Sequence, residues 1–296
     1  MNALQPWILL ENIYWPTMAL NPNNHSIALL QKYPENIDWS NLCTNTNEHA
    51  VSLLLQYPDK IDWRTLSGNK NKEMFHLIET ISYTEYIDWT ALSGNENEYA
   101  IELLQKYPEY IDWKTLSGNE HDYAIDLLEQ YADKIVWTTL SGNENKQAIQ
   151  LLQKNPEKID WLMLSGNEND DAIALLQTYP ENIHWKILSK NKNNHAVRLL
   201  LQEYEINPEH IFWPNICANT HDDAMKLLQQ HPEHIYWPAL SKNNNDIALV
   251  LLQTHVTNIH WDKLSANENK NIIPLLENNQ EKIDWFHFSQ NSFIFV

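Results

Sequence analysis

Residues 87–110 read IDWTALSGNENEYAIELLQKYPEY, and the chain repeats this pattern along most of its 296 residues. Nine of the eleven gaps between the tryptophans of this pattern are 24 residues, and the other two are 26 and 28. A period of this length is typical of solenoids, in which stacked copies of one unit bury a continuous core. Twelve of the 13 tryptophans mark the repeat: Trp15, Trp39, Trp63, Trp89, Trp113, Trp137, Trp161, Trp185, Trp213, Trp237, Trp261 and Trp285.

The longer part of each repeat has the spacing of an amphipathic helix. With the tryptophan as slot 0, apolar residues stand at slots +11, +12, +14, +15 and +18. Asparagine, a good helix N-cap, fills slot +6 in all twelve copies, from Asn21 to Asn291. We therefore predict a helix of about 11 or 12 residues that begins at this asparagine and ends before slot +19. Proline follows there in seven copies: Pro34, Pro58, Pro108, Pro156, Pro180, Pro208 and Pro232.

The remaining dozen residues predict a second, shorter element. Aspartate before the tryptophan is a second candidate N-cap: Asp38, Asp62, Asp88, Asp112, Asp160 and Asp284. The five glycines stand at slot +5, where a helix C-terminus is expected: Gly68, Gly94, Gly118, Gly142 and Gly166. Lysine or alanine takes this slot in other copies, so a positive φ is not required. We favour a single turn of α or 3-10 helix, and a longer second helix that starts at the proline is the alternative.

The predicted fold is therefore an all-α, right-handed solenoid of about twelve 24-residue units, each with one long helix and one short turn. We expect one domain over residues 1–296, with terminal caps over about 1–12, including Trp7, and 286–296. The two longer copies are expected to absorb their extra residues near the end of the long helix. Four extra residues around Glu203 to Ile206 equal about one helical turn and preserve the apolar stripe.

The tryptophan and asparagine rows both have a structural interpretation. A buried tryptophan contributes of order 4–6 kcal/mol before the entropy cost, which favours the rings as the core between layers. The alternative is a row of exposed rings that stack bases or sugars, but such a stripe would promote aggregation. For the asparagines we expect capping and hydrogen bonds between repeats.

Composition limits the classes of partner. The net charge of −19 opposes binding to nucleic-acid phosphates and to anionic membranes, and more weakly favours a basic protein partner. The sequence shows no signal peptide and no apolar run long enough to span a bilayer. Cys43 and Cys217 occupy the same slot seven repeats apart, beyond disulfide reach, and we interpret them as small buried residues. Together these features predict a cytoplasmic protein.

We find no motif for catalysis or cofactor binding. The chain has no phosphate-binding loop, nucleophile elbow or His-Glu-x-x-His motif, and acid pairs such as Asp170-Asp171 and Asp222-Asp223 suit the first turns of helices. Among the 13 histidines, His231, His234 and His255 are the best metal candidates, but they occupy slots that hold other residues elsewhere and are more simply substituted surface positions. We therefore predict a non-enzymatic protein without cofactor or metal.

One candidate binding patch follows from comparing the repeats. Slots +1 and +2 are mostly polar, yet Leu162, Met163 and Ile187 are apolar there, and the next two copies place Phe212 and Tyr236 in the aspartate slot. These five residues predict an apolar strip along one edge that binds a partner protein. The alternative is that their side chains lie flat against neighbouring repeats.

Residues 100–119, AIELLQKYPEYIDWKTLSGN, and 148–167, AIQLLQKNPEKIDWLMLSGN, resemble a short tryptophan-containing helical repeat of proteins encoded by giant DNA viruses. The family pattern is close to NPxAIxLLxxNPxxIDWxxLSx, and the resemblance covers essentially the whole chain. Residues 288–295, FSQNSFIF, resemble the closing half-unit of that family. This chain departs from the pattern in having a proline after the slot +6 asparagine only at Pro22.

The resemblance implies a viral protein in the host cytoplasm and implies no chemistry. We expect a protein-interaction scaffold that binds host or viral proteins through its repeat surface, and a monomer rather than an oligomer. The alternative is a structural component of the virion or virus factory that assembles by end-to-end packing, with the apolar segment 286–296 as the contact.

Overall fold

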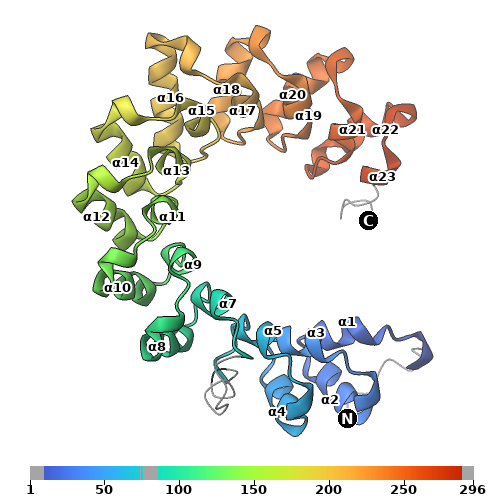
Figure 1. Ribbon diagram of the computed structural model, residues 1–296. Coiled ribbons are helices and arrows are strands. Elements are labelled where there is room, and N and C mark those ends of the chain that lie inside the picture. The colour runs from blue at the N-terminus through green and yellow to red at the C-terminus, as the bar shows by residue number, and fades with distance from the viewer. Residues whose placement is uncertain (1–9, 74, 76–85, 289–296) are drawn as a thin grey trace. The chain divides into compact units, whose positions relative to one another are not determined.

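The computed structural model describes residues 10–73, 75 and 86–288, and all regular structure in these residues is helical (Figure 1). The chain forms two compact halves, residues 1–148 and 149–296. Each half is a run of the same Trp-containing repeat, which confirms the predicted helical-repeat solenoid. The handedness of the superhelix and the single-domain organisation stay predictions.

Each regular repeat holds three helical elements, where the sequence predicted two. In the repeat that starts at Trp89, these are the short helix α7 (Trp89–Ser93), the long helix α8 (Glu98–Lys106) and the 3-10 turn η5 (Pro108–Tyr110). Proline suits the first position of a helix because it has no N–H to leave unpaired. It therefore begins a 3-10 turn of its own, and two extended residues separate this turn from the next short helix.

The helices have closely similar bounds in successive repeats. The short helices are α1 (Trp15–Leu20), α3 (Trp39–Thr44), α5 (Trp63–Ser67), α7, α9 (Trp113–Ser117), α11 (Trp137–Ser141), α13 (Trp161–Gly166), α15 (Trp185–Leu188), α17 (Trp213–Ala218), α19 (Trp237–Lys242), α21 (Trp261–Ser265) and α23 (Trp285–Phe288). The long helices are α2 (Asn24–Lys32), α4 (Glu48–Gln56), α8, α10 (Asp122–Gln130), α12 (Lys146–Lys154), α14 (Asp170–Thr178), α16 (Asn194–Ile206), α18 (Asp222–Gln230), α20 (Asp246–Thr254) and α22 (Ile273–Glu277). The 3-10 turns are η1 (Leu10–Asn12), η2 (Pro34–Asn36), η3 (Pro58–Lys60), η5, η6 (Ala132–Lys134), η7 (Pro156–Lys158), η8 (Pro180–Asn182), η9 (Pro208–His210), η10 (Pro232–His234), η11 (Val256–Asn258), η12 (Lys270–Ile272) and η13 (Gln280–Lys282).

The predicted start of the long helix is wrong by about three residues. The N-cap is the residue at slot +8, where Asn97 accepts a hydrogen bond from the Tyr99 N–H and His121 accepts one from the Tyr123 N–H. The helix then runs for 9 residues in most repeats rather than the predicted 11 or 12. Both asparagines of the Asn-x-Asn motif are good caps, so capping preference alone could not choose between them.

The slot +6 asparagine is instead a buried bridge between repeats. Asn243 is 4% exposed, and its amide group donates hydrogen bonds to the carbonyl oxygens of Cys217 (2.9 Å) and Asn219 (2.8 Å) in the preceding repeat. Its side-chain oxygen accepts a hydrogen bond from the Asn245 N–H at 2.9 Å. One side chain thus pairs three backbone groups that folding removes from water. This confirms the predicted hydrogen bonds between repeats.

Serine at slot +4 forms a second bridge. The Ser117 hydroxyl donates a hydrogen bond to the Trp113 carbonyl oxygen (2.7 Å) and accepts one from the Val136 N–H of the next repeat (3.0 Å). Cys217 occupies the same slot, and its Sγ accepts a hydrogen bond from the Tyr236 N–H at 3.1 Å. In these repeats the slot holds a small side chain that accepts a hydrogen bond, and in the first repeat it holds the equally small and buried Ala19.

The tryptophan rings are less buried than the sequence predicted. All the repeat tryptophans from Trp15 to Trp261 are half-buried, and Trp285 is 60% exposed. Each tryptophan is the first residue of its short helix, and in seven repeats its ring contacts the ring of the slot +18 side chain. Trp113 and Tyr131 show this contact, with ring centroids 5.1 Å apart. The interior is filled by smaller side chains.

The fully buried core comes from slots −2, +3, +11, +12, +14 and +15. Leu116, Ala124 and Leu128 are each 0% exposed, and the same slots are buried in repeats of both halves. Burying one such leucine or isoleucine contributes about 1.5–3 kcal/mol, so apolar contacts between adjacent layers are the main favourable term.

Space rather than φ explains two of the glycines at slot +5. Gly68, Gly94, Gly118 and Gly142 have φ between −88° and −94°, which any residue can adopt. A β-carbon on Gly94 would lie 3.0 Å from Cγ2 of Thr115 in the next repeat. On Gly118 it would lie 3.2 Å from Cγ2 of Thr139, so these two glycines make room for the slot +2 side chain of the next repeat, whereas Gly68 and Gly166 have room for a β-carbon.

The 28-residue copy confirms one prediction about the longer repeats. Its long helix α16 has 13 residues, so the extra residues add one turn that includes Glu203 to Ile206. The extra residues of the 26-residue copy fall among residues 76–85, outside the described part of the chain. The same holds for residues 1–9 of the predicted N-terminal cap, with Trp7, and for residues 289–296 of the C-terminal cap.

Candidate protein-binding surface

The short helices of each half lie along one edge and the long helices along the other (Figure 1). We call slots −1 to +7 of the repeats the short-helix face. In the C-terminal half this face is built from α13, α15, α17, α19 and α21, and α13 contacts α15 while α19 contacts both α17 and α21. All five residues of the predicted patch belong to this face.

The patch residues differ in exposure. Leu162 is 45% exposed, Met163 is 38% exposed and Tyr236 is 50% exposed. Ile187 and Phe212 are half-buried. Leu162, Met163 and Tyr236 therefore fit an exposed apolar strip. Ile187 and Phe212 are partly exposed and partly covered, so they fit neither the exposed strip nor packing against neighbouring repeats completely.

Contacts between repeats join slot +1 of one repeat to slot −1 of the next, and they pair the patch residue Phe212 with Lys186 rather than with another patch residue. The slot +1 side chain meets slot −1 of the next repeat, as in Arg64 with Asp88 (Nε to Oδ2, 3.9 Å) and Ser40 with Asp62 (3.0 Å). The same contact brings the Lys186 Nζ to 4.5 Å from the Phe212 ring centroid.

The sequence analysis missed the charge of this surface. Residues 184–192, 212–220 and 236–244, which form the short-helix face of three successive repeats, contain no aspartate or glutamate. They contain four lysines, all exposed: Lys186, Lys190, Lys192 and Lys242. Comparing charge slot by slot, rather than over the whole chain, would have found this region.

Carboxylates in the aspartate slot of other repeats have a capping role. Asp62 accepts hydrogen bonds from the Thr65 N–H (3.1 Å), the Thr65 hydroxyl (2.8 Å) and the Ser40 hydroxyl (3.0 Å). The Thr65 hydroxyl lowers the pKa of Asp62 most, and the Thr65 N–H lowers it further. Asp38, Asp88, Asp112 and Asp160 cap their short helices in the same way, which confirms the predicted second N-cap.

The histidines proposed as metal candidates contact tryptophans. The His234 ring stacks on Trp213 with centroids 4.1 Å apart, and His255 lies 5.1 Å from Trp237. His231 contacts the Tyr204 hydroxyl through Nδ1 at 3.1 Å. Over the described part of the chain, no group of three or more His, Cys, Asp or Glu side chains is arranged to hold a metal ion.

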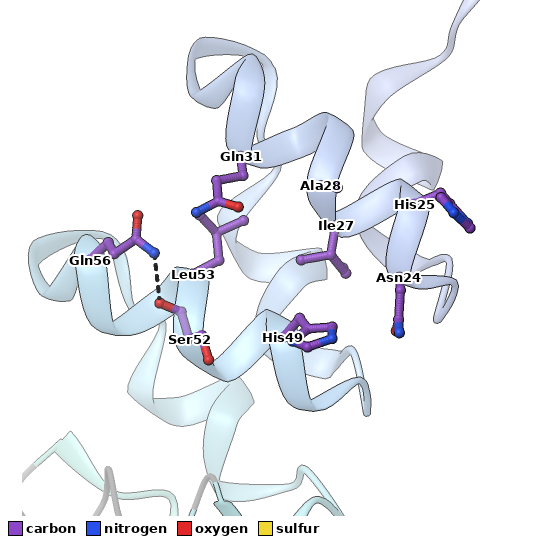
Figure 2. A pocket seen from close by; sticks show the side chains of 9 residues that line it. All are labelled: Asn24, His25, Ile27, Ala28, Gln31, His49, Ser52, Leu53 and Gln56. Carbon is purple, nitrogen blue, oxygen red and sulfur yellow. Dashed lines mark hydrogen bonds between the residues drawn. The ribbon is translucent and has the colours of Figure 1, made fainter. Parts of the chain in front are cut away.

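Two open grooves lie elsewhere, both in the N-terminal half. The first, of about 500 Å³, lies between α2 and α4; Ile27 and Leu53 line it, with His25 and His49 at its rim (Figure 2). Its hydrogen bond from Gln56 Nε2 to the Ser52 carbonyl oxygen is 3.2 Å long. The second, of about 530 Å³, lies between short helices and is lined by Thr90, Glu96, Asp112, Lys114 and Thr139, among others.

The two cysteines are free and buried, one in each half. Burial raises the pKa of both Cys43 and Cys217 to about 11. A thiol with so high a pKa is a poor nucleophile at neutral pH, so both residues are structural.

Comparison with family models, curated proteins and solved structures gives no match for this chain. Among the described residues, no helix is both long enough and apolar enough to cross a bilayer.

Proposed function

We propose that this chain is a non-enzymatic protein-interaction scaffold that binds host or viral proteins in the cytoplasm of a host cell. One observation carries the proposal: the polar residues that recur through the repeats are used inside the fold, whereas exposed side chains at slots −1 and +1 differ from repeat to repeat. Asn243 and Ser117 illustrate the first group, and Leu162 and Tyr236 the second. An extended surface that varies over a constant interior is how repeat proteins present binding sites.

The apolar residues of the short-helix face are the best candidates for contact with a partner. Exposed side chains such as Leu162 and Tyr236 have the size and chemistry of residues that dominate protein interfaces. Other repeats have threonine, lysine or serine at slots +1 and +2, so the fold does not require apolar residues there.

The test is affinity capture from cells, with a variant that alters only this patch. Leu162→Thr, Met163→Thr and Ile187→Thr together should change the melting temperature by less than ~4 °C. The same variant should lose most of the captured partner. Leu55→Thr, at a residue that is 58% exposed on α4, is the matched control and should retain the partner. A large loss of stability in the triple variant would show that these residues are core.

A structural role in the virion or virus factory is the second candidate, and one observation favours it. Trp285 is 60% exposed and Phe286 is 72% exposed, in the last described helix α23. Tryptophans of other repeats are half-buried, and Trp113 for example is in contact with the Tyr131 ring, so a second copy of the chain could cover Trp285 with a comparable contact.

Sizing chromatography over a range of protein concentrations separates these two functions. The scaffold predicts a monomer at every concentration. End-to-end assembly predicts larger species that grow with concentration and disappear in a Trp285→Ser, Phe286→Ser variant.

A further inference from the structure

We propose that the short-helix face between residues 162 and 242 docks an acidic peptide segment that carries apolar side chains. The inference rests on the proposed scaffold function and names the chemical class of its partner. It depends on a local reversal of charge in a protein whose net charge is −19.

The charge reversal occupies three successive repeats. The four lysines Lys186, Lys190, Lys192 and Lys242 are exposed on residues 184–192, 212–220 and 236–244, from which aspartate and glutamate are absent. Glu168 of the preceding repeat borders this region, and its Oε1 accepts a hydrogen bond from the Lys192 N–H at 3.4 Å. The nearest carboxylates along the chain lie outside this face: Asp222 and Asp246 are in the first turns of the long helices α18 and α20, and Glu209 and Glu233 are in the 3-10 turns η9 and η10. Glu233 also lies 3.4 Å from His231 and 3.7 Å from His234. The face therefore attracts negative groups within a surface that repels them elsewhere.

The absence of carboxylates is not imposed by the backbone. Tyr236, before α19, has φ −89° and ψ 93°, and Asp88, before α7, has φ −81° and ψ 92°. Aspartate would fit at Tyr236 and would cap the helix, but four successive repeats hold His184, Phe212, Tyr236 and His260 in this slot. These repeats thus omit a stabilising aspartate cap, which is expected where the surface is used for something else.

Apolar and basic side chains alternate across this face. Leu162 and Met163 are exposed on α13, and the Lys186 Nζ lies over the Phe212 ring in the following repeats. An acidic residue of a bound peptide would pair with a lysine at the rim, while its apolar neighbours would cover Met163 or Tyr236. This arrangement matches the usual anatomy of an interface, in which an apolar centre is surrounded by a polar rim.

A nucleic acid fits the same face less well. Residues 184–192, 212–220 and 236–244 contain no arginine, which dominates phosphate recognition. Of the three exposed side chains Leu162, Met163 and Tyr236, only Tyr236 offers a stacking plane for a base, whereas a single strand is bound by several such planes in succession. A continuous phosphate chain would also pass the carboxylates of Glu209 and Glu233, whereas a peptide can place its few carboxylates only at the lysines.

The test selects peptides from a random phage-displayed library on the intact, immobilised chain. We expect the selected peptides to be enriched in aspartate or glutamate together with aromatic or aliphatic residues. Peptides enriched in lysine or arginine, or tighter binding of a single-stranded oligonucleotide than of any selected peptide, would overturn the proposal.

Substitutions then locate the binding of the best selected peptide. Changing Lys186, Lys190, Lys192 and Lys242 to glutamate should weaken binding by about 10-fold or more, and glutamine at the four positions should weaken it less. Glutamate at the exposed Lys72, Lys106, Lys114 and Lys134 of the N-terminal half is the matched control and should leave affinity within about 2-fold. A separate variant that keeps the four lysines but carries Leu162→Thr and Tyr236→Thr should bind the peptide about 5-fold or more weakly.

The outcomes separate this inference from the function on which it rests. Peptide binding that survives both sets of substitutions would refute the docking site and leave the scaffold function standing. A chain that selects no peptide and captures no protein from cells would count against both. Concentration-dependent assembly that the four glutamates abolish would identify the occupant as a second copy of this chain and would also overturn the proposal.

Discussion

The short-helix faces of the two halves have the same kinds of residue at their buried slots but differ in the charge and polarity of their exposed residues. Helices α9 and α19 bury leucine and serine at slots +3 and +4, and Asn119 and Asn243 bridge to the preceding repeat in the same way. On the surface, Asp112 in the N-terminal half corresponds to Tyr236 in the C-terminal half. The difference teaches that a few buried slots determine the stacking, so the exposed slots are free to carry binding chemistry.

Variation at slot −1 lowers the stability of the short helix when the new residue cannot cap it. Asp112 caps α9 by accepting a hydrogen bond from the Thr115 N–H at 2.8 Å, whereas Tyr236 makes no side-chain cap for α19. The C-terminal half therefore loses one cap in each of several repeats. Stability and surface chemistry are separable at slots +1 and +2 but are linked at slot −1.

The largest effect is expected at the shared interior. Asn119→Asp and Asn243→Asp should each lower the free energy of unfolding by about 3 kcal/mol or more. The new carboxylate would face two carbonyl oxygens to which the amide group now donates, and water cannot solvate it there. Chemical denaturation of the two variants, followed by circular dichroism, measures the loss.

Asn244→Asp is the control for the aspartate substitutions, because Asn244 is exposed and only one residue away from Asn243. It should change the free energy of unfolding by less than about 0.5 kcal/mol. If only one of the two buried variants is destabilised, the two halves do not share the same interior and the comparison fails.

The sequence predicted the repeat, the helical class and the apolar core because those features depend on spacing. The 3.6-residue periodicity identified the long helix, and the aspartate before six of the twelve tryptophans identified the second cap. The bridge through Asn243 was expected because a polar residue present in every copy must satisfy something that every copy has. These inferences use only which slots vary and which do not.

The details that the sequence did not predict depend on three-dimensional competition between similar residues. Asn95 and Asn97 have the same capping preference, and only the path of the preceding repeat decides that the first one is buried. Trp113 was predicted to be core because of its size, but its place at a helix end leaves it half-buried. At the candidate surface the sequence analysis found Leu162 and Tyr236 and missed Lys186, since net charge averaged the local reversal away.

Removing a slot −1 cap in one half and adding one in the other should produce two smaller effects on the free energy of unfolding, with opposite signs. Asp62→Ala in the N-terminal half should lower the free energy of unfolding by about 1 kcal/mol, because α5 loses its cap. Tyr236→Asp in the C-terminal half should raise it by about 0.5–1 kcal/mol, because α19 gains one. Thermal unfolding of both variants gives the two signs. Tyr236→Asp should also weaken the acidic peptide, so stability and binding should change in opposite directions.

The pH dependence of Asp62 adds a check on the same exchange. Its pKa is lowered by the Thr65 hydroxyl, so the carboxylate stabilises the folded state above the pKa of the unfolded chain. This contribution is lost as the pH falls through the lowered folded-state pKa. Asp62→Asn keeps a capping side chain and should be less sensitive to acid than the wild type. Equal acid sensitivity of the two proteins would show that Asp62 does not titrate as inferred.

The smallest expected effect uses the buried thiol that each half contains. Cys43→Ser and Cys217→Ser should each change the free energy of unfolding by less than about 1 kcal/mol at neutral pH, because serine fills this slot in most repeats. Burial raises the thiol pKa from its usual 9.0 to about 11, so the folded state holds the proton more tightly than the unfolded chain. Each thiol therefore contributes stability that is present below the unfolded pKa and lost as the pH rises through the folded pKa, and the serine variants should lose less stability over that window.

The same thiols report whether the two halves open together. At pH 7, a thiol of pKa about 11 is ionised in about one molecule in ten thousand, so both should react slowly with a disulfide reagent in the folded protein. With single-cysteine variants, the denaturant concentration at which each thiol becomes reactive reports the opening of its own half. We expect the C-terminal half to open first, because Phe212 and Tyr236 leave their short helices without a side-chain cap. If Cys43 becomes reactive at a lower denaturant concentration than Cys217, missing caps do not decide which half is less stable. The loss of stability that we attribute to an uncapped slot −1 would then be too large.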